Sequence, residues 1–100
     1  MGPAGDALEV LERELSASPA EFLRGLRSAF PDGVEAGHLS YRVRRGGAAM
    51  EIGVTPGPDL VIAGLRLPTI RVRMRFTEGD AQARARLLAY LDLAAHRGGG

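Results

Sequence analysis

The clearest pattern in the chain is a strict alternation of apolar and charged side chains between Ile70 and Phe76. Alternation with a period of two is typical of a half-buried β-strand, because successive side chains point to opposite faces of the sheet. The apolar residues of this stretch are expected in the core. The charged residues are Arg71, Arg73 and Arg75. We therefore predict a strand that covers a core with one face and exposes a row of arginines on the other.

Near the N-terminus the apolar residues follow a helical period instead. Leu8, Leu11 and Leu15 recur at intervals of three and four, and most positions between them are charged. Asp6 is suited to cap the first turn. This spacing predicts a short amphipathic helix from about Asp6 to Leu15, after a flexible leader of residues 1–5.

A second helix has the strongest local start signal in the chain. Ser18, followed by Pro19 and then by Glu21, matches a capping box with proline in the first helical position. The apolar residues that follow recur at helical spacing as far as Phe30. The turn-forming residues 31–33 then end the predicted helix.

From residue 38 onward the period changes to two, and we predict four strands. Their expected ranges are 38–44, 48–55, 60–65 and 70–76. Glycine and proline clusters at 46–47 and 56–59 separate them. Strands joined by such short connections pair in an antiparallel meander. In this meander the first strand, which carries Arg42 and Arg44 on its polar side, and the last strand would be opposite edges.

The segment 60–65 differs from the other predicted strands because it is apolar on both faces. Such a strand is expected in the interior of a sheet, covered on both sides, or in contact with another chain. We therefore select Val61, Ala63 and Leu65 as a candidate self-association strand.

A last helix is predicted over 81–96, where alanine, glutamine, arginine and leucine favour helix formation. Asp80 is a candidate N-cap and Gly98 a candidate C-terminal cap, with a flexible glycine tail over 98–100. The whole chain, 1–100, is thus predicted to be a single α+β domain. Its architecture would be two N-terminal helices, a four-stranded antiparallel β-meander and a C-terminal helix, with the helices packed on one face of the sheet.

The composition is that of an ordinary folded protein, since 45% of the 100 residues are hydrophobic and 25% are charged. The chain contains no cysteine, which excludes disulfides, thiolate catalysis and cysteine-bound metal clusters. It shows neither a secretory signal nor an apolar stretch long enough to span a membrane. We therefore expect a cytoplasmic protein without membrane contact.

The predicted arginine face is the main candidate for a charged binding surface. All 13 basic residues are arginine and 12 acids nearly balance them, so anion binding would require local clustering. The candidate cluster, an anion or partner surface, comprises Arg42, Arg44, Arg71, Arg73 and Arg75. Three interpretations are open: a solvated face paired with acids such as Glu51, a contact with a second copy, and an anion or nucleic-acid surface. Tyr41 and Phe76 fall on the apolar side, so the face lacks an aromatic platform for stacking bases.

No catalytic, metal-binding or cofactor-binding residues emerge from the sequence. The only histidines are His38 and His96, and neither lies in a recognisable motif. We predict a small non-catalytic cytoplasmic protein without a cofactor, an interaction or accessory module that binds a protein partner or forms a homodimer. Anion or nucleic-acid binding through the arginine face is one alternative. A small-ligand or enzyme domain with a site built from scattered residues is another.

Overall fold

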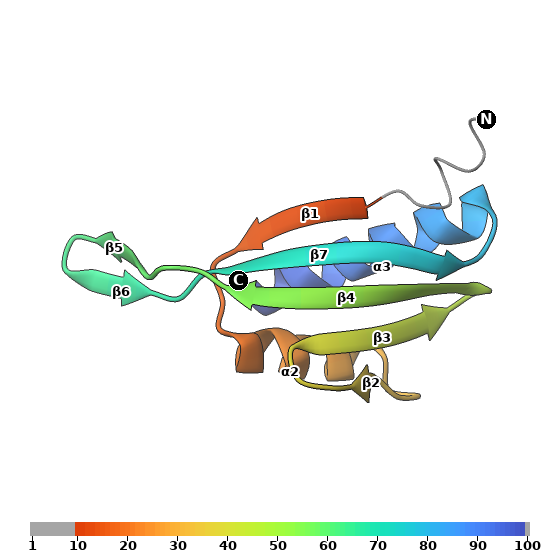
Figure 1. Cartoon of the computed structure of the whole chain (residues 1–100), viewed down its shortest axis with the longest axis horizontal. Coiled ribbons are helices and arrows are strands. Elements are labelled where there is room, and N and C mark those ends of the chain that lie inside the picture. The colour runs from red at the N-terminus through yellow and green to blue at the C-terminus, as the bar shows by residue number, and fades with distance from the viewer. Residues whose placement is uncertain (1–9, 100) are drawn as a thin grey trace.

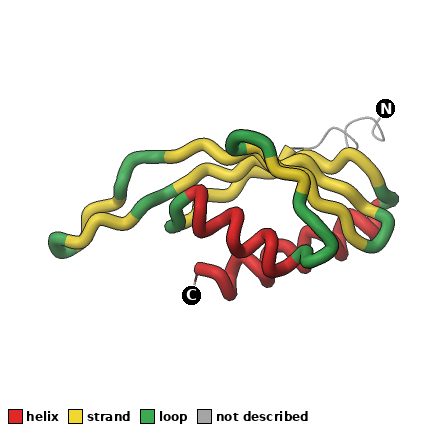
Figure 2. Tube along the Cα trace, turned by 90° about the horizontal axis from the view of Figure 1, so that it is seen from below, coloured by secondary structure: helices red, strands yellow, loops and turns green. Residues whose placement is uncertain are grey.

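Within residues 10–99, which the computed structural model describes, the chain forms seven strands and two helices (Figure 1). In chain order these are β1 (Val10–Leu15), α2 (Pro19–Ala29), β2 (Glu35–Ala36), β3 (Ser40–Arg45), β4 (Ala48–Pro56), β5 (Leu60–Ile62), β6 (Leu65–Leu67), β7 (Ile70–Glu78) and α3 (Ala81–Gly99). Five strands form one antiparallel sheet in the order β1-β7-β4-β3-β2, and β5 and β6 form a separate hairpin. Both helices lie against one face of the larger sheet (Figure 2). The fold is α+β, but the predicted numbers of helices and strands are wrong.

The predicted first helix is a β-strand over its described part, residues 10–15. This strand, β1, pairs along its whole length with β7, with Leu11 opposite Met74 and Leu15 opposite Ile70. A spacing of four residues places two leucines on one face of a helix, but it also places them on one face of a strand. The open edge of β7 decides between the two, because it offers the segment a complete backbone ladder. The predicted leader over 1–5 and the start of the predicted helix lie outside the described residues.

The predicted four-stranded meander is also wrong, because the segment 60–65 does not enter the sheet. Instead β4 pairs directly with β7, with Val54 opposite Val72 and Ile52 opposite Met74. Because β1 pairs with the other side of β7, β7 is an interior strand and not the predicted edge strand. The apolar segment between β4 and β7 folds back on itself as the β5–β6 hairpin.

Two predicted helix N-caps are confirmed. The Ser18 hydroxyl accepts from the Glu21 amide at 3.1 Å, and the Glu21 carboxylate accepts from the Ser18 amide at 2.8 Å, so α2 begins with a complete capping box. The Asp80 carboxylate accepts from the Ala83 amide at 2.8 Å and caps α3. The predicted C-terminal cap is wrong, since α3 continues to Gly99 and includes Gly98.

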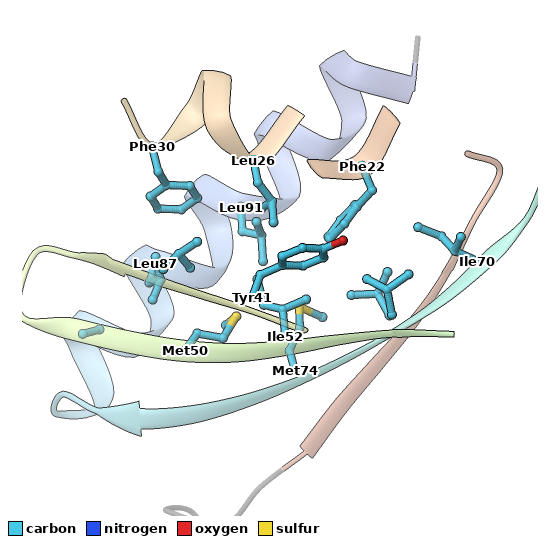
Figure 3. Packing of buried hydrophobic residues seen from close by; sticks show 14 of the residues in the cluster. Phe22, Leu26, Phe30, Tyr41, Met50, Ile52, Ile70, Met74, Leu87 and Leu91 are labelled. Atoms are coloured by element: carbon cyan, nitrogen blue, oxygen red, sulfur yellow. The ribbon is translucent and has the colours of Figure 1, made fainter. Parts of the chain in front are cut away.

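The core lies between the two helices and the inner faces of β3, β4 and β7 (Figure 3). The sheet contributes side chains such as Ile52 and Met74, which are 1% and 2% exposed. Leu26 of α2 and Leu87 of α3 pack against them from the other side. The apolar half of the alternating segment that begins at Ile70 is therefore buried, as its period of two predicts.

Tyr90 of α3 joins the two helices to the sheet. Its hydroxyl donates to the carbonyl of Ala29 at the end of α2, and its ring meets the Phe30 ring edge-on at 5.4 Å. The Arg45 guanidinium at the end of β3 lies 3.8 Å from the centroid of the same ring. These contacts fix the helical layer over one face and leave the opposite face of the sheet without a described helix.

Candidate interaction surfaces

The sheet face opposite the helices carries ionised side chains in cross-strand rows, and we call it the charged face. Its members from β1 and β7 are Glu12, Glu14, Arg71, Arg73 and Arg75, and those from β2, β3 and β4 are Glu35, Arg42, Arg44 and Glu51. Acid and base stand opposite each other in most of these rows. Residues directly opposite in an antiparallel pair point to the same face, so this register brings opposite charges into contact.

Glu51 is the centre of the longest row. It accepts from Arg42 Nη2 through Oε2 at 2.7 Å and from Arg75 Nη2 through Oε1 at 2.5 Å. The hydrogen bond from Arg75, followed by that from Arg42, lowers the pKa of the Glu51 carboxyl below its ordinary value. The hydrogen bond to Glu51 in turn raises the pKa of Arg42. Arg42 of β3 stands directly opposite Glu51 in the β3–β4 register, so the two side chains lie on the same face of the sheet.

The structure brings together arginines that the predicted meander separates. Only β4 lies between β3 and β7. The arginines of β3 and those of β7 therefore share one continuous surface, which carries Arg42, Arg44, Arg71, Arg73 and Arg75. Arg44 approaches Glu78 at 3.2 Å, and Arg73 approaches Glu12 at 3.9 Å. Arg71 stands opposite Glu14 without an ion pair among the described residues. Glutamates thus already neutralise most of the arginine positions on the charged face.

A second surface is provided by the segment 57–69 between β4 and β7, which we call the arm. It contains the β5–β6 hairpin and extends beyond the five-stranded sheet and both helices (Figures 1 and 2). At its base the Gly57 amide donates to the Thr69 carbonyl at 2.9 Å, and the Thr69 hydroxyl donates to the Pro58 carbonyl at 2.7 Å. Pro58 and Pro68 have no amide hydrogen, so the β4–β7 ladder cannot continue through them.

The tip of the arm is a two-residue turn at Ala63 and Gly64. Both have positive φ, 52° and 83°, as a two-residue hairpin turn of type I′ requires. The turn pairs Ile62 with Leu65 and sets the register of the whole hairpin. Alanine is unusual at such a position, because its Cβ disfavours positive φ.

The register gives the hairpin two unlike faces. Leu60 pairs with Leu67 and Ile62 with Leu65, so these four side chains share one side, which we call the aliphatic face. The opposite side has Val61 across from Arg66, whose guanidinium approaches Asp59 at 3.7 Å. Leu60, Ile62 and Leu65 are 46%, 51% and 64% exposed, and no residue of the hairpin belongs to the described core cluster.

The residues selected for self-association are thereby distributed differently from the prediction. Val61 lies on β5, Ala63 in the turn and Leu65 on β6, so they share neither a strand nor a face. Sequence reasoning missed the rest of the aliphatic face. The available signal was Gly64, a turn former between two short segments rich in aliphatic residues, Leu60–Ile62 and Leu65–Leu67.

The described residues give little support for a metal site or for a membrane-spanning helix. No group of three or more histidine, aspartate or glutamate side chains is placed there to hold a metal ion. His38 is exposed and lies before β3. None of the described helices is long and apolar enough to cross a membrane. The cytoplasmic location expected from the sequence stays a prediction.

No protein-family model matches this chain, and no curated protein matches it.

Proposed function

We propose that this protein is a non-catalytic interaction protein that docks on another protein through the aliphatic face of the arm. The observation that carries the proposal is the half exposure of Leu60, Ile62 and Leu65 on an element that contributes nothing to the described core. Contiguous exposed apolar side chains of this kind are typical of protein contacts. Their position on a projecting hairpin makes them accessible to a partner.

The energetics of the hairpin support the same proposal. A two-stranded hairpin is marginally stable alone in water, because few side chains cover it. Full burial of an aliphatic side chain contributes about 1.5 to 3 kcal/mol, so covering a half-exposed one contributes roughly 1 kcal/mol. A partner that covered the aliphatic face would therefore gain several kcal/mol and would also hold the arm in its folded form.

Anion or nucleic-acid binding through the charged face is less favoured by the contacts. A phosphate would have to displace Glu51 from Arg42 and Arg75, or Glu78 from Arg44, before it could bind those guanidinium groups. It would also approach the remaining carboxylates of the same face, which repel it. The strong charge-assisted pairs at Glu51 therefore support a solvated face that organises the sheet.

Site-specific photo-crosslinking in cells tests the proposal. A photoreactive amino acid placed at Leu65 is expected to form a protein adduct, whereas the same group at Arg24, an exposed position on α2, is expected to form none. The adduct at Leu65 should also disappear when Ile62→Asp is introduced in the same chain. Equal adduct formation at Leu65 and Arg24, or none at Leu65, would refute the docking role of the arm.

A further inference from the structure

We infer that the partner of the arm is a second copy of this chain, and that two arms stack through their aliphatic faces around a two-fold axis. This inference rests on the proposed docking function and names its occupant. It follows from three properties of the molecule: the neutrality of the aliphatic face, the charges on the edge strands β1 and β2 of the larger sheet, and the reach of the arm.

The aliphatic face is complementary to itself. Its four side chains form two short rows, Leu60 with Leu67 and Ile62 with Leu65, and none of them is charged. The nearest charges, Arg66 and its partner Asp59, belong to the opposite side of the hairpin and to its base. A two-fold axis places identical patches against each other, so a neutral aliphatic patch meets no like charge when it stacks on its copy.

The edge of β1 lacks this property. In an antiparallel ladder, residues directly opposite share a face, so β1 paired with its own copy would place acid against acid. The central registers oppose Glu12 to Glu12 or to Glu14 of the second copy, and one of them also opposes Arg13 to Arg13. Charged residues on an edge strand discourage such pairing. Self-association through the β1 edge is therefore disfavoured, and the other edge strand, β2, is only two residues long and carries Glu35.

The reach of the arm makes the contact geometrically simple. The hairpin extends past the ends of both helices, so two arms can overlap face to face without either helical layer between them (Figures 1 and 2). Stacked sheets pack about 10 Å apart, which is the thickness of two layers of interdigitated aliphatic side chains. The five-stranded sheets and helices of the two chains would then lie at opposite ends of the dimer.

The size of the patch sets the strength of the dimer. Three side chains that are about half exposed, together with the partly buried Leu67, offer roughly 200 to 300 Å² per chain, whereas a standard stable interface buries about 800 Å² per partner. We therefore expect a reversible dimer with a dissociation constant in the micromolar range or weaker. The interface contains no ion pair, so raising NaCl from about 0.05 M to about 1 M should leave the dimer undiminished.

Sedimentation velocity of the full chain over increasing concentration tests the inference with a matched pair of variants. Leu65 and Val61 have nearly equal exposure, 64% and 60%, but lie on opposite faces of the arm. Leu65→Asp is expected to weaken the dimer at least tenfold, and Val61→Asp, which faces Arg66, is expected to leave it unchanged. Leu65→Ser adds no charge and should weaken the dimer in the same direction. Equal effects of the two aspartate variants, or a wild-type chain that stays monomeric at millimolar concentration, would overturn the inference.

The crosslinking adduct at Leu65 separates failure of this inference from failure of the proposed function. An adduct with the mass of two chains supports both. An adduct with a different protein overturns the second-copy inference and retains the interaction function. The absence of any adduct overturns both.

Discussion

Replacing the arm by a short turn should leave the stability of the rest of the protein almost unchanged. The change removes residues 58–68 and joins Gly57 to Thr69 through Asn-Gly, the preferred sequence for a type I′ turn. Gly57 already donates to the Thr69 carbonyl, so the new turn closes an existing pair at the end of β4 and β7.

Two small terms of opposite sign determine the expected free energy of unfolding. The variant loses two exposed hydrogen bonds, from the Thr69 hydroxyl to the Pro58 carbonyl and, at 3.5 Å, from the Ser16 hydroxyl to the Pro68 carbonyl, which together contribute about 1 kcal/mol. The connection becomes roughly fivefold shorter, which favours closure by about 1.4 kcal/mol at about 0.6 kcal/mol per doubling of length. No core contact is lost, because no removed residue belongs to the core cluster of the described chain. The net change is expected within about 1 kcal/mol of zero.

Urea denaturation followed by circular dichroism measures this change. The midpoint should stay close to that of the wild type, and the slope should fall slightly because less surface becomes exposed on unfolding. The reasoning is refuted by a loss of more than about 3 kcal/mol, since removal of one large buried aliphatic side chain costs about 2 to 5 kcal/mol. Such a loss would mean that the arm packs on the body and is not free to bind.

Three further predictions concern the body of the protein. Gly79→Ala should lower the free energy of unfolding by about 2 to 4 kcal/mol in urea denaturation, because Gly79 has a φ of 112° and a Cβ there would lie 2.9 Å from the Ala48 Cα. An unchanged midpoint would contradict this packing. Ser18→Ala should lower the free energy of unfolding by about 1 kcal/mol in the same assay, because α2 loses its N-cap. Complete loss of α2 would contradict this local role of Ser18. For Glu51, the lowered pKa in the folded state means that its ionised form stabilises the protein above the unfolded pKa, and that this contribution is lost as pH falls through the folded pKa. The difference in urea midpoint between wild type and Glu51→Gln should therefore shrink from pH 7 to about pH 3, and a difference that grows on acidification would contradict the sign.

The alternating strand and the capping box could be predicted from sequence because their causes are local. The two hydrogen bonds of the capping box join residues three apart, and the inner face of β7 follows directly from its period of two. β1 could not be predicted in this way. Its inner face is interrupted by Arg13, whose charge is satisfied by Asp92 of α3 at 3.6 Å, a contact between residues far apart in the sequence.

The prediction for the arm was wrong because its aliphatic side chains are exposed, whereas a segment of this composition is usually buried. A continuous aliphatic run normally indicates an interior strand, and here it forms the most exposed apolar element among the described residues. Its turn was concealed by Ala63, which adopts a positive φ that favours glycine or asparagine. The misplacement of the arm also separated Arg42 from Arg75, which the structure joins through Glu51.

The central claim is that the arm is the docking element and that its aliphatic face contacts a second copy. Methyl NMR spectra of the full chain, recorded from low micromolar to millimolar concentration, test it most directly. The account predicts concentration-dependent shifts of the Leu60, Ile62 and Leu65 methyl groups, with the buried Ile52 methyl unchanged as an internal reference. Shifts that are absent from the arm, or that occur instead at exposed Leu93 of α3, would contradict it.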